Sequence, residues 1–261
     1  MMDAAHFEHD LALLDWHLEL GADEAIGEVP VNRYKLKAPA PKPKSQVEAA
    51  PQPTLVEPET PQTIDTTPLA NACPNLESLR NTIEAFDGCE LKRGAKSTVF
   101  CDGNPAARVM IVGEAPGREE DRAGKPFIGR AGQLLDKMFA AIGLSRFEDL
   151  PETALYITNV LPWRPPQNRD PSADEIALMK PFLLRHIALA QPDFIVTMGN
   201  PSTKTLFETT LGITKMRGQW GEVLGIPALP MFHPAYLLRS PEFKREAWAD
   251  LLSLKAWLRD G

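Results

Sequence analysis

The chain has 261 residues, of which 43% are hydrophobic and 24% charged, with a formal net charge of −7. This length suits one domain of ordinary size with an appendage, or two small domains. No apolar run approaches the roughly 20 residues that cross a bilayer, and the acidic N-terminus does not fit a signal peptide. Three cysteines are too few for a disulfide framework, so we expect a cytoplasmic protein with free thiols.

The net negative charge of the chain comes entirely from its N-terminal part. Residues 1–72 hold twelve acidic and five basic side chains, whereas residues 73–261 hold 23 of each. A neutral domain binds DNA when its basic side chains gather on one face, so the acidic total does not exclude a nucleic-acid partner.

The first 72 residues divide into two segments. Residues 1–37 include a stretch, residues 7–20, whose leucines fall near one side of a helix. Residues 38–72 are rich in proline and poor in large apolar side chains, which is typical of a disordered linker. These segments could tether a protein partner. We expect residues 73–261 to form the folded domain, acting as a monomer.

From residue 73 onward, apolar runs alternate with amphipathic stretches. After a helix over residues 75–86, strands are expected at 107–112, 155–160, 194–198 and 228–232, and helices at 133–142, 172–190, 202–208 and 241–258. This alternation is typical of a parallel sheet covered on both faces. The predicted fold is α/β, a three-layer αβα sandwich with a central, mainly parallel, four-stranded sheet.

Ligands of such folds bind at the carboxyl ends of the strands. Three segments there leave a strand and enter an unusual loop, and they read GEAPG (113–117), TNVLPWRPPQNRDP (158–171) and FHPAYLLR (232–239). We therefore expect the functional site to be built from these three loops.

The glycine-rich loop does not fit a phosphate site. Residues 113–118 read GEAPGR and lack the second glycine of a dinucleotide fingerprint, and Gly124-Lys125 is followed by proline where a P-loop needs Ser or Thr. The loop does carry Phe127, and an aromatic face beside closely approaching backbone suits a flat, uncharged heterocycle. The alternative is that Phe127 belongs to the core.

Two polar residues at the other strand ends suit the same ligand. Asn159 lies in a strand, where asparagine is depleted, and its carboxamide can read a carbonyl and an adjacent ring N–H at once; capping a turn is the alternative. His233 directly follows a strand, where it is a candidate for stabilising developing negative charge, although a lone histidine is more often structural.

Together these segments resemble the uracil-DNA glycosylases of the bacterial family-four type. The resemblance covers residues 107–257 and rests on GEAPGREED, GKPFIGRAGQLLD, YITNVLPWRPPQNRDP and FHPAYLLRSP, in that order. It implies an enzyme that flips uracil out of single- or double-stranded DNA, hydrolyses the N-glycosidic bond and so initiates base-excision repair.

The resemblance also implies roles for individual residues. The loop from Gly113 through Ala115 to Gly117 would line the base pocket and place the attacking water, Phe127 would stack on uracil, and Asn159 would read its edge. His233 would face a uracil carbonyl. Glu114 and Glu120 are both candidates for the general base. On the DNA side, Leu237 would fill the vacated base stack, and Arg164 and Arg239 would contact phosphates.

The chain departs from this family at its cysteines. Most members hold an iron–sulfur cluster with four cysteines, but the corresponding positions here are Phe86, Cys89, Trp163 and Met179. Because such clusters need their thiolates, we predict that the protein has no cluster, no other metal and no cofactor. Trp163 and Met179 would fill the vacated volume with apolar contacts.

Two other functions stay open at this point. One is a glycosylase for another deaminated base, or a nucleoside hydrolase. Whether activity requires DNA distinguishes an enzyme of free nucleosides from a uracil-DNA glycosylase. The other is a catalytically inactive DNA-binding relative. The sequence itself does not decide the strand and mismatch preference of the enzyme.

Overall fold

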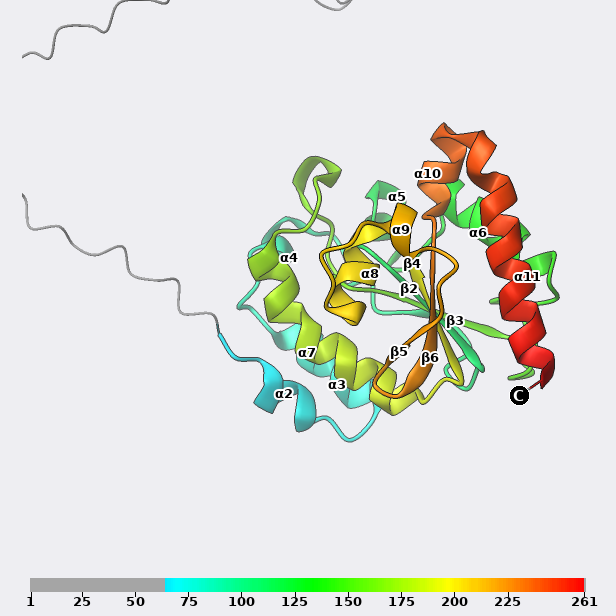
Figure 1. The fold of residues 1–261 in the computed structure, drawn as a ribbon. Coiled ribbons are helices and arrows are strands. Elements are labelled where there is room, and N and C mark those ends of the chain that lie inside the picture. Colours follow the sequence, from blue (N-terminus) through cyan, green and yellow to red (C-terminus); the bar gives the residue numbers. More distant parts are fainter. Residues whose placement is uncertain (1–63, 261) are drawn as a thin grey trace, which may run out of the picture. The chain divides into compact units, whose positions relative to one another are not determined.

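The computed structural model describes residues 64–260, and these form one α/β unit (Figure 1). The predicted N-terminal helix and most of the predicted linker lie outside the described residues. None of the helices within residues 64–260 is long and apolar enough to cross a membrane.

The centre of the domain is a mainly parallel sheet of six strands in the order β1-β3-β2-β4-β6-β5. Its parallel strands are β2 (Val109–Gly113), β3 (Leu155–Asn159), β4 (Phe194–Met198) and β6 (Ile226–Met231). They are the four predicted strands, with bounds that differ by at most two residues. Their residues are mostly buried, as continuous β-branched and aliphatic runs predict for a doubly covered parallel sheet.

Two short antiparallel strands extend the sheet beyond the four that were predicted. β1 (Asp102–Gly103) pairs with β3, and β5 (Gly221–Val223) pairs with β6. Strands of two or three residues are too short to show a hydrophobic alternation, so the sequence pattern missed them. The β5–β6 turn has Leu224 and Gly225 at positive φ, and only the glycine is typical of such a turn.

Helices cover both faces of the sheet, which confirms the three-layer prediction (Figure 1). On one face, side chains of α3 (Leu76–Ala85), α7 (Ala173–Ala190) and α8 (Asn200–Phe207) pack against Met110 and Val112. On the other, α6 (Arg130–Ala140) and α11 (Lys244–Asp260) pack against Val109 and Ile111. The alternation along β2 therefore divides the core into two layers.

The ordered domain begins earlier than predicted. The linker was expected to extend to residue 72, but a short helix, α2 (Thr67–Asn71), already lies within it. Thr66 and Ala70 are buried, and the Thr66 hydroxyl donates a hydrogen bond to the Leu178 carbonyl of α7. The composition of this segment, rich in proline and polar residues, predicted disorder. A few buried contacts nevertheless hold one helical turn against the domain.

The remaining helices within residues 64–260 are short and lie mainly in the loops. They are α4 (Leu91–Gly94), α5 (Arg118–Ala123), α9 (Ile213–Met216), α10 (Pro234–Arg239) and two 3-10 turns, η2 (Pro166–Asn168) and η3 (Pro241–Phe243). α5 lies inside the glycine-rich loop and ends at Gly124, whose φ of 70° suits a glycine C-cap. The long predicted loop thus has its own helical turn.

Candidate active site

A cavity of about 610 Å³ lies beside the carboxyl ends of the parallel strands. β2 leads into it through Glu114, β3 ends there at Asn159, and the segments after β4 and β6 contribute Gly199 and His233. Most of the predicted site residues line this cavity, namely Glu114, Ala115, Gly117, Glu120, Phe127, Asn159, His233 and Arg239. A second hollow, of about 710 Å³, lies over α3 and contains none of them.

Gly113 lies directly against two residues that line the cavity, Asn159 and Phe127. Gly113 pairs with Asn159 across β2 and β3, and a Cβ atom on Gly113 would lie 2.4 Å from Asn159 Oδ1. The same Cβ would lie 2.5 Å from the Phe127 ring. Glycine is needed at position 113 because the Asn159 and Phe127 side chains leave no room for a Cβ atom there.

Phe127 is buried and has a left-handed backbone, with a φ of 53°. Its ring stacks on the His233 imidazole, with 5.3 Å between ring centroids and 27° between planes. The side chain packs in a hydrophobic core cluster and also lines the cavity. A ring held in this way offers a flat apolar surface to a planar ligand.

His233 is the N-cap residue of α10, and its Nδ1 accepts a hydrogen bond from the Ala235 amide at 3.1 Å. This contact places the proton of the neutral ring on Nε2, which is then a donor. Burial, and to a smaller extent the nearby Arg239 charge, lowers the pKa of His233 to about 4. The site thus presents a neutral imidazole with a single N–H to donate.

The two candidate carboxylates differ in what they contact. Glu120 Oε1 accepts hydrogen bonds from the amides of Ile128 and Gly129, at 3.1 and 3.0 Å, and so supports the loop that carries Phe127. Glu114 lines the cavity, and burial together with the charge of Asp170 raises its pKa to about 7. A carboxyl with a pKa near neutrality is suited to exchange protons with water.

The three predicted DNA contacts are placed differently. Arg239 lines the cavity, and Arg164 donates from Nε to Asn168 Oδ1 at 2.8 Å. Leu237, expected to enter the DNA stack, is only 1% exposed and packs in a cluster with Phe232. This placement does not fit a wedge, because the first turn of α10 points Leu237 inward. Its neighbour Leu238 is 37% exposed.

Several cavity residues escaped the sequence analysis. Asn200 follows β4, and its Oδ1 accepts a hydrogen bond from the Ile213 amide at 2.7 Å. The Gly199-Asn200 pair directly follows the predicted strand 194–198, so a polar residue at a strand end was a signal for Asn200 as it was for Asn159. Asp170 also lines the cavity, but its effect on Glu114 comes from a tertiary approach of the η2 loop that no local pattern indicates.

The positions at which the resembled family has cysteines do not fit an iron–sulfur cluster here. Phe86, Cys89, Trp163 and Met179 belong to one hydrophobic cluster, and only Cys89 offers a thiol. The indole of Trp163 donates to Thr98 Oγ1 at 3.1 Å, and the Phe86 ring lies 5.6 Å from that of Phe182. Within residues 64–260 no group of three or more His, Cys, Asp or Glu side chains is arranged to hold a metal ion.

Fold and cavity together define an α/β protein whose parallel strands lead into a cavity lined by an aromatic ring, a carboxamide and an imidazole. The family model described as the uracil DNA glycosylase superfamily matches residues 100–252, and the chain belongs to that superfamily.

Curated relatives agree with this assignment. The chain is 39% identical to a type-4 uracil-DNA glycosylase of Sulfurisphaera tokodaii over 180 residues, which are 66% of this chain and 79% of the relative. It is 37% identical to a type-4 uracil-DNA glycosylase of Thermotoga maritima over 188 residues, 70% of this chain and 95% of the relative. A type-5 uracil-DNA glycosylase of Pyrobaculum aerophilum is 30% identical over 177 residues, 63% of this chain and 77% of the relative.

Proposed function

We propose that this protein is a monofunctional uracil-DNA glycosylase that excises uracil from DNA, leaves an abasic site and thereby initiates base-excision repair. The observation that carries the proposal is the convergence of Phe127, Asn159 and His233 in one cavity. An aromatic face, a carboxamide and a neutral N–H donor are the groups that a flipped uracil requires. The superfamily membership supports the same reaction.

The proposed recognition follows from the geometry of these three side chains. A uracil flipped out of the DNA stacks on the Phe127 ring, and the Asn159 carboxamide reads its carbonyl and ring N–H. Cytosine offers an amino group and an unprotonated nitrogen at these positions, so the donors and acceptors no longer match. A buried mismatch of this kind leaves polar groups unpaired, which is why the pocket discriminates strongly.

The proposed hydrolysis uses His233 and Glu114. Water forms a bond to C1′ of the sugar and transfers a proton to the Glu114 carboxylate, while the N-glycosidic bond breaks and its electron pair leaves with uracil. The Nε2–H of His233 donates to the uracil oxygen on which negative charge grows. A donor of this kind contributes on the order of 3 kcal/mol to the transition state. We assign the base to Glu114 in preference to Glu120, because Glu120 Oε1 already accepts from two amides of the Phe127 loop.

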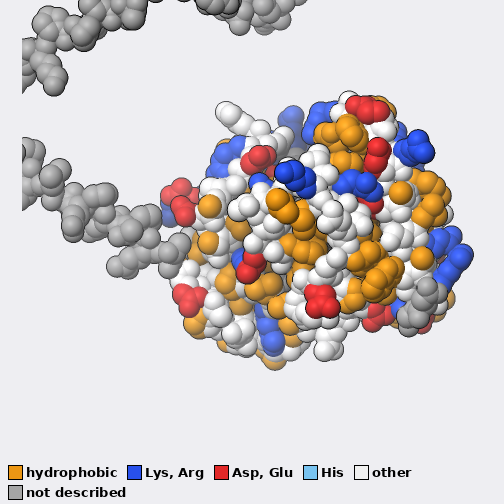
Figure 2. Space-filling model, viewed as in Figure 1, with side chains coloured by type: hydrophobic (Ala, Val, Ile, Leu, Met, Phe, Trp, Pro, Cys, Tyr) orange, Lys and Arg blue, Asp and Glu red, His pale blue; other side chains and the backbone are white. Residues whose placement is uncertain are grey.

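The proposed DNA surface surrounds the mouth of the cavity. On the face drawn in Figure 2, Lys and Arg side chains lie mainly in the upper part, near α9 and α10, and a hydrophobic area lies below them. Arg239 and Arg164 would contact phosphates. We assign the wedge to Leu238, because it is the exposed leucine of α10.

We further propose that the enzyme needs no iron–sulfur cluster or other cofactor. The apolar contacts of Trp163, Met179 and Phe86 support this view, because they fill the volume between α3, α7 and the β3 end. The proposed base pocket is lined by residues of one chain, which favours a monomer. We expect the protein to act in the cytoplasm, and residues 1–63 to bind any protein partner.

The test uses the purified full chain and end-labelled oligonucleotides with one uracil, single-stranded or opposite G or A. Alkali cleaves any abasic site, and His233→Ala, purified in the same way, controls for contaminating glycosylases. We expect a cleaved band that is reduced on the order of a hundredfold in the variant. Absence of cleavage on every substrate, from a protein shown to be folded, would overturn the proposal.

A further inference from the structure

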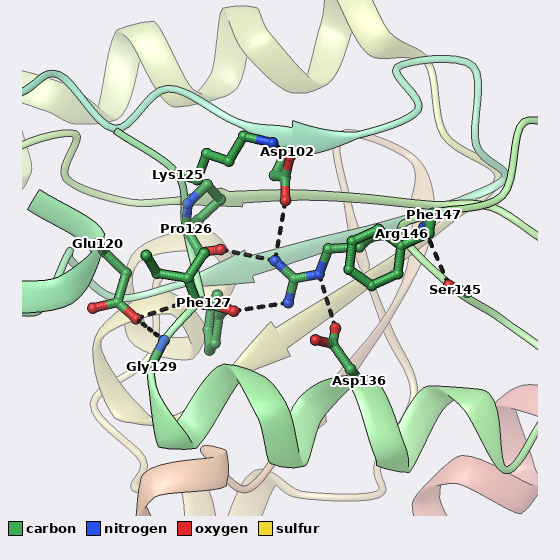
Figure 3. Close-up of polar contacts among 11 residues, drawn as sticks. Asp102, Glu120, Lys125, Pro126, Phe127, Gly129, Asp136, Ser145, Arg146 and Phe147 are labelled. Atoms are coloured by element: carbon green, nitrogen blue, oxygen red, sulfur yellow. Dashed lines mark hydrogen bonds and ion pairs between the residues drawn. The ribbon is translucent and has the colours of Figure 1, made fainter. Parts of the chain in front are cut away.

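Arg146 is a buried arginine that contacts the loop of the base-stacking aromatic. Its side chain is 2% exposed and lies after α6. Nη1 donates to the Pro126 carbonyl and Nη2 to the Phe127 carbonyl, both at 2.9 Å (Figure 3). Its remaining contacts are to Asp136, from Nε at 2.8 Å, and to Asp102, from Nη1 at 3.3 Å. The guanidinium thus joins two consecutive carbonyls to two carboxylates.

The charge of Arg146 is balanced locally. Asp102 and Asp136 accept from it, and Lys125 forms a second ion pair with Asp102 at 3.1 Å. A buried charge is tolerated only when it is paired and hydrogen-bonded, and this network meets both conditions. The planar fork of an arginine can reach both carbonyls at once, whereas a lysine ammonium cannot reproduce that geometry.

The loop that Arg146 holds has a strained backbone. Phe127 has a φ of 53°, in the left-handed region that an aromatic residue rarely adopts. A Cβ atom on Gly132 would lie 1.7 Å from the Phe127 carbonyl oxygen, so the first turn of α6 passes directly against this peptide. Strain of this kind persists only where surrounding contacts hold it.

The same loop is held from its other side by an anion. Glu120 Oε1 accepts from the amides of Ile128 and Gly129, so the carboxylate binds the N–H groups while Arg146 binds the preceding carbonyls (Figure 3). Opposite charges therefore fix opposite sides of a short turn. The ring that emerges from this turn stacks on His233 and presses on Gly113.

We propose that Arg146 is a positioning residue for base recognition: it holds the Pro126 and Phe127 carbonyls so that the Phe127 ring stands in the pocket. The inference rests on the proposed function of that pocket. Phosphate contacts hold the DNA, and the ring determines how much of the bound DNA keeps its uracil in the pocket. Flipping a base out of the stack costs free energy, so the flipped state is a minor fraction of the bound DNA. Loosening the ring lowers that fraction, and with it the maximal single-turnover rate, while the affinity, which the unflipped complex determines, changes little.

The test compares Arg146→Lys, alone and combined with Phe127→Ala, under single-turnover conditions. Rates are expressed per folded molecule. Arg146→Lys should lower the maximal rate about tenfold or more, because a small misplacement of a binding group is costly. The half-saturating DNA concentration should change by less than about twofold. Arg185→Lys is the matched control, because the Arg185 guanidinium also donates to a backbone carbonyl, that of Cys73, away from the cavity.

The double variant separates positioning from general destabilisation. If Arg146 acts through the ring, Arg146→Lys should change the rate of a Phe127→Ala protein by less than about twofold. The same loss in both backgrounds, or an unchanged maximal rate of Arg146→Lys, would overturn the proposal.

A second readout does not depend on excision. The Phe127 ring lies over His233, so the NMR shifts of the imidazole protons report the ring position. Arg146→Lys should move these signals, and Arg185→Lys should leave them unchanged. If the unmodified protein did not cleave uracil-containing DNA, the proposed function would fail, and the NMR comparison would still decide whether Arg146 positions the ring.

Discussion

Gly113 and Asn159 lie directly opposite each other on neighbouring parallel strands, so close that a side chain on the glycine would overlap the asparagine carboxamide. Gly113, the last residue of β2, therefore acts as a spacer: it leaves the room that the side chain of Asn159, the last residue of β3, occupies. The Phe127 ring fills the same gap from a third segment. The proposed recognition of a base in this pocket would therefore depend on a residue that has no side chain.

Gly113→Ala should therefore strongly reduce uracil excision per folded molecule. The new Cβ would displace Asn159 Oδ1 and the Phe127 ring, which are 2.4 and 2.5 Å from its position. We expect a loss on the order of a hundredfold in the single-turnover rate. Gly94→Ala is the matched control, because a Cβ there would meet no atom within 4 Å. Equal activity of the two variants would contradict the spacer role.

Asn159 should determine the choice of base. Asn159→Asp removes the amide donors but keeps the size of the side chain, so the donor to the uracil carbonyl is lost. We expect uracil excision to fall on the order of a hundredfold and the preference for uracil over cytosine to narrow. Competing oligonucleotides with uracil or cytosine at one position would measure this ratio. A variant that kept the ratio of the unmodified protein would show that another group reads the base edge.

The excision rate should rise with pH in a single step near neutrality, which is the rising limb of the pH–rate profile. Burial, and then the charge of Asp170, raises the pKa of Glu114 to about 7, so its basic form accumulates above that pH. His233 has a pKa of about 4 and stays neutral throughout this range. Asp170→Asn removes a like charge, lowers the Glu114 pKa and should move the limb to lower pH. A limb that persists unchanged in Glu114→Gln would assign it to another group.

The same carboxyl should make stability depend on pH. The pKa of Glu114 is higher in the folded protein than its ordinary value of 4.5, so folding favours the neutral carboxyl. The stability that this preference provides is fully present below about pH 4.5, decreases as the pH rises, and is lost by about pH 7. Glu114→Gln should therefore unfold at a higher temperature than the unmodified protein above this window. After allowance for partial exposure, the difference is on the order of 1–2 kcal/mol. Thermal melts on both sides of the window would measure it.

The convergence of the strand-end residues could be predicted from sequence, because parallel strands bring their carboxyl ends to one edge. That argument places Gly113, Asn159 and His233 together before any coordinates are known. The contribution of Arg146 could not be predicted, since it depends on a tertiary contact between a segment without a motif and two carbonyls. The orientation of Leu237 also escaped prediction, because it depends on the phase of a six-residue helix.

Two adjacent leucines should give opposite results. Leu238, which is 37% exposed, should act on DNA, so Leu238→Ala should slow excision from duplex DNA more than from single strands, where no stack needs filling. Leu237, which is 1% exposed, should act on the fold, and Leu237→Ala should cost about 2–5 kcal/mol of stability. Paired rate and denaturation measurements distinguish them. A duplex-selective defect in Leu237→Ala alone would return the wedge to Leu237.

The packing around Trp163 should carry the stability that a metal cluster provides in proteins that depend on one. Its indole is 1% exposed and donates to Thr98, and Met179 and Phe86 lie in the same hydrophobic cluster. Trp163→Ala should therefore cost about 3–5 kcal/mol through the cavity that it leaves. Excision per folded molecule should change little, because Trp163 does not line the catalytic cavity. Denaturant titration measures the loss of stability, and excision rates are compared per folded molecule. Iron analysis of the unmodified protein completes the test. Stoichiometric iron would overturn this account, because a bound cluster and the apolar packing would compete for the same volume.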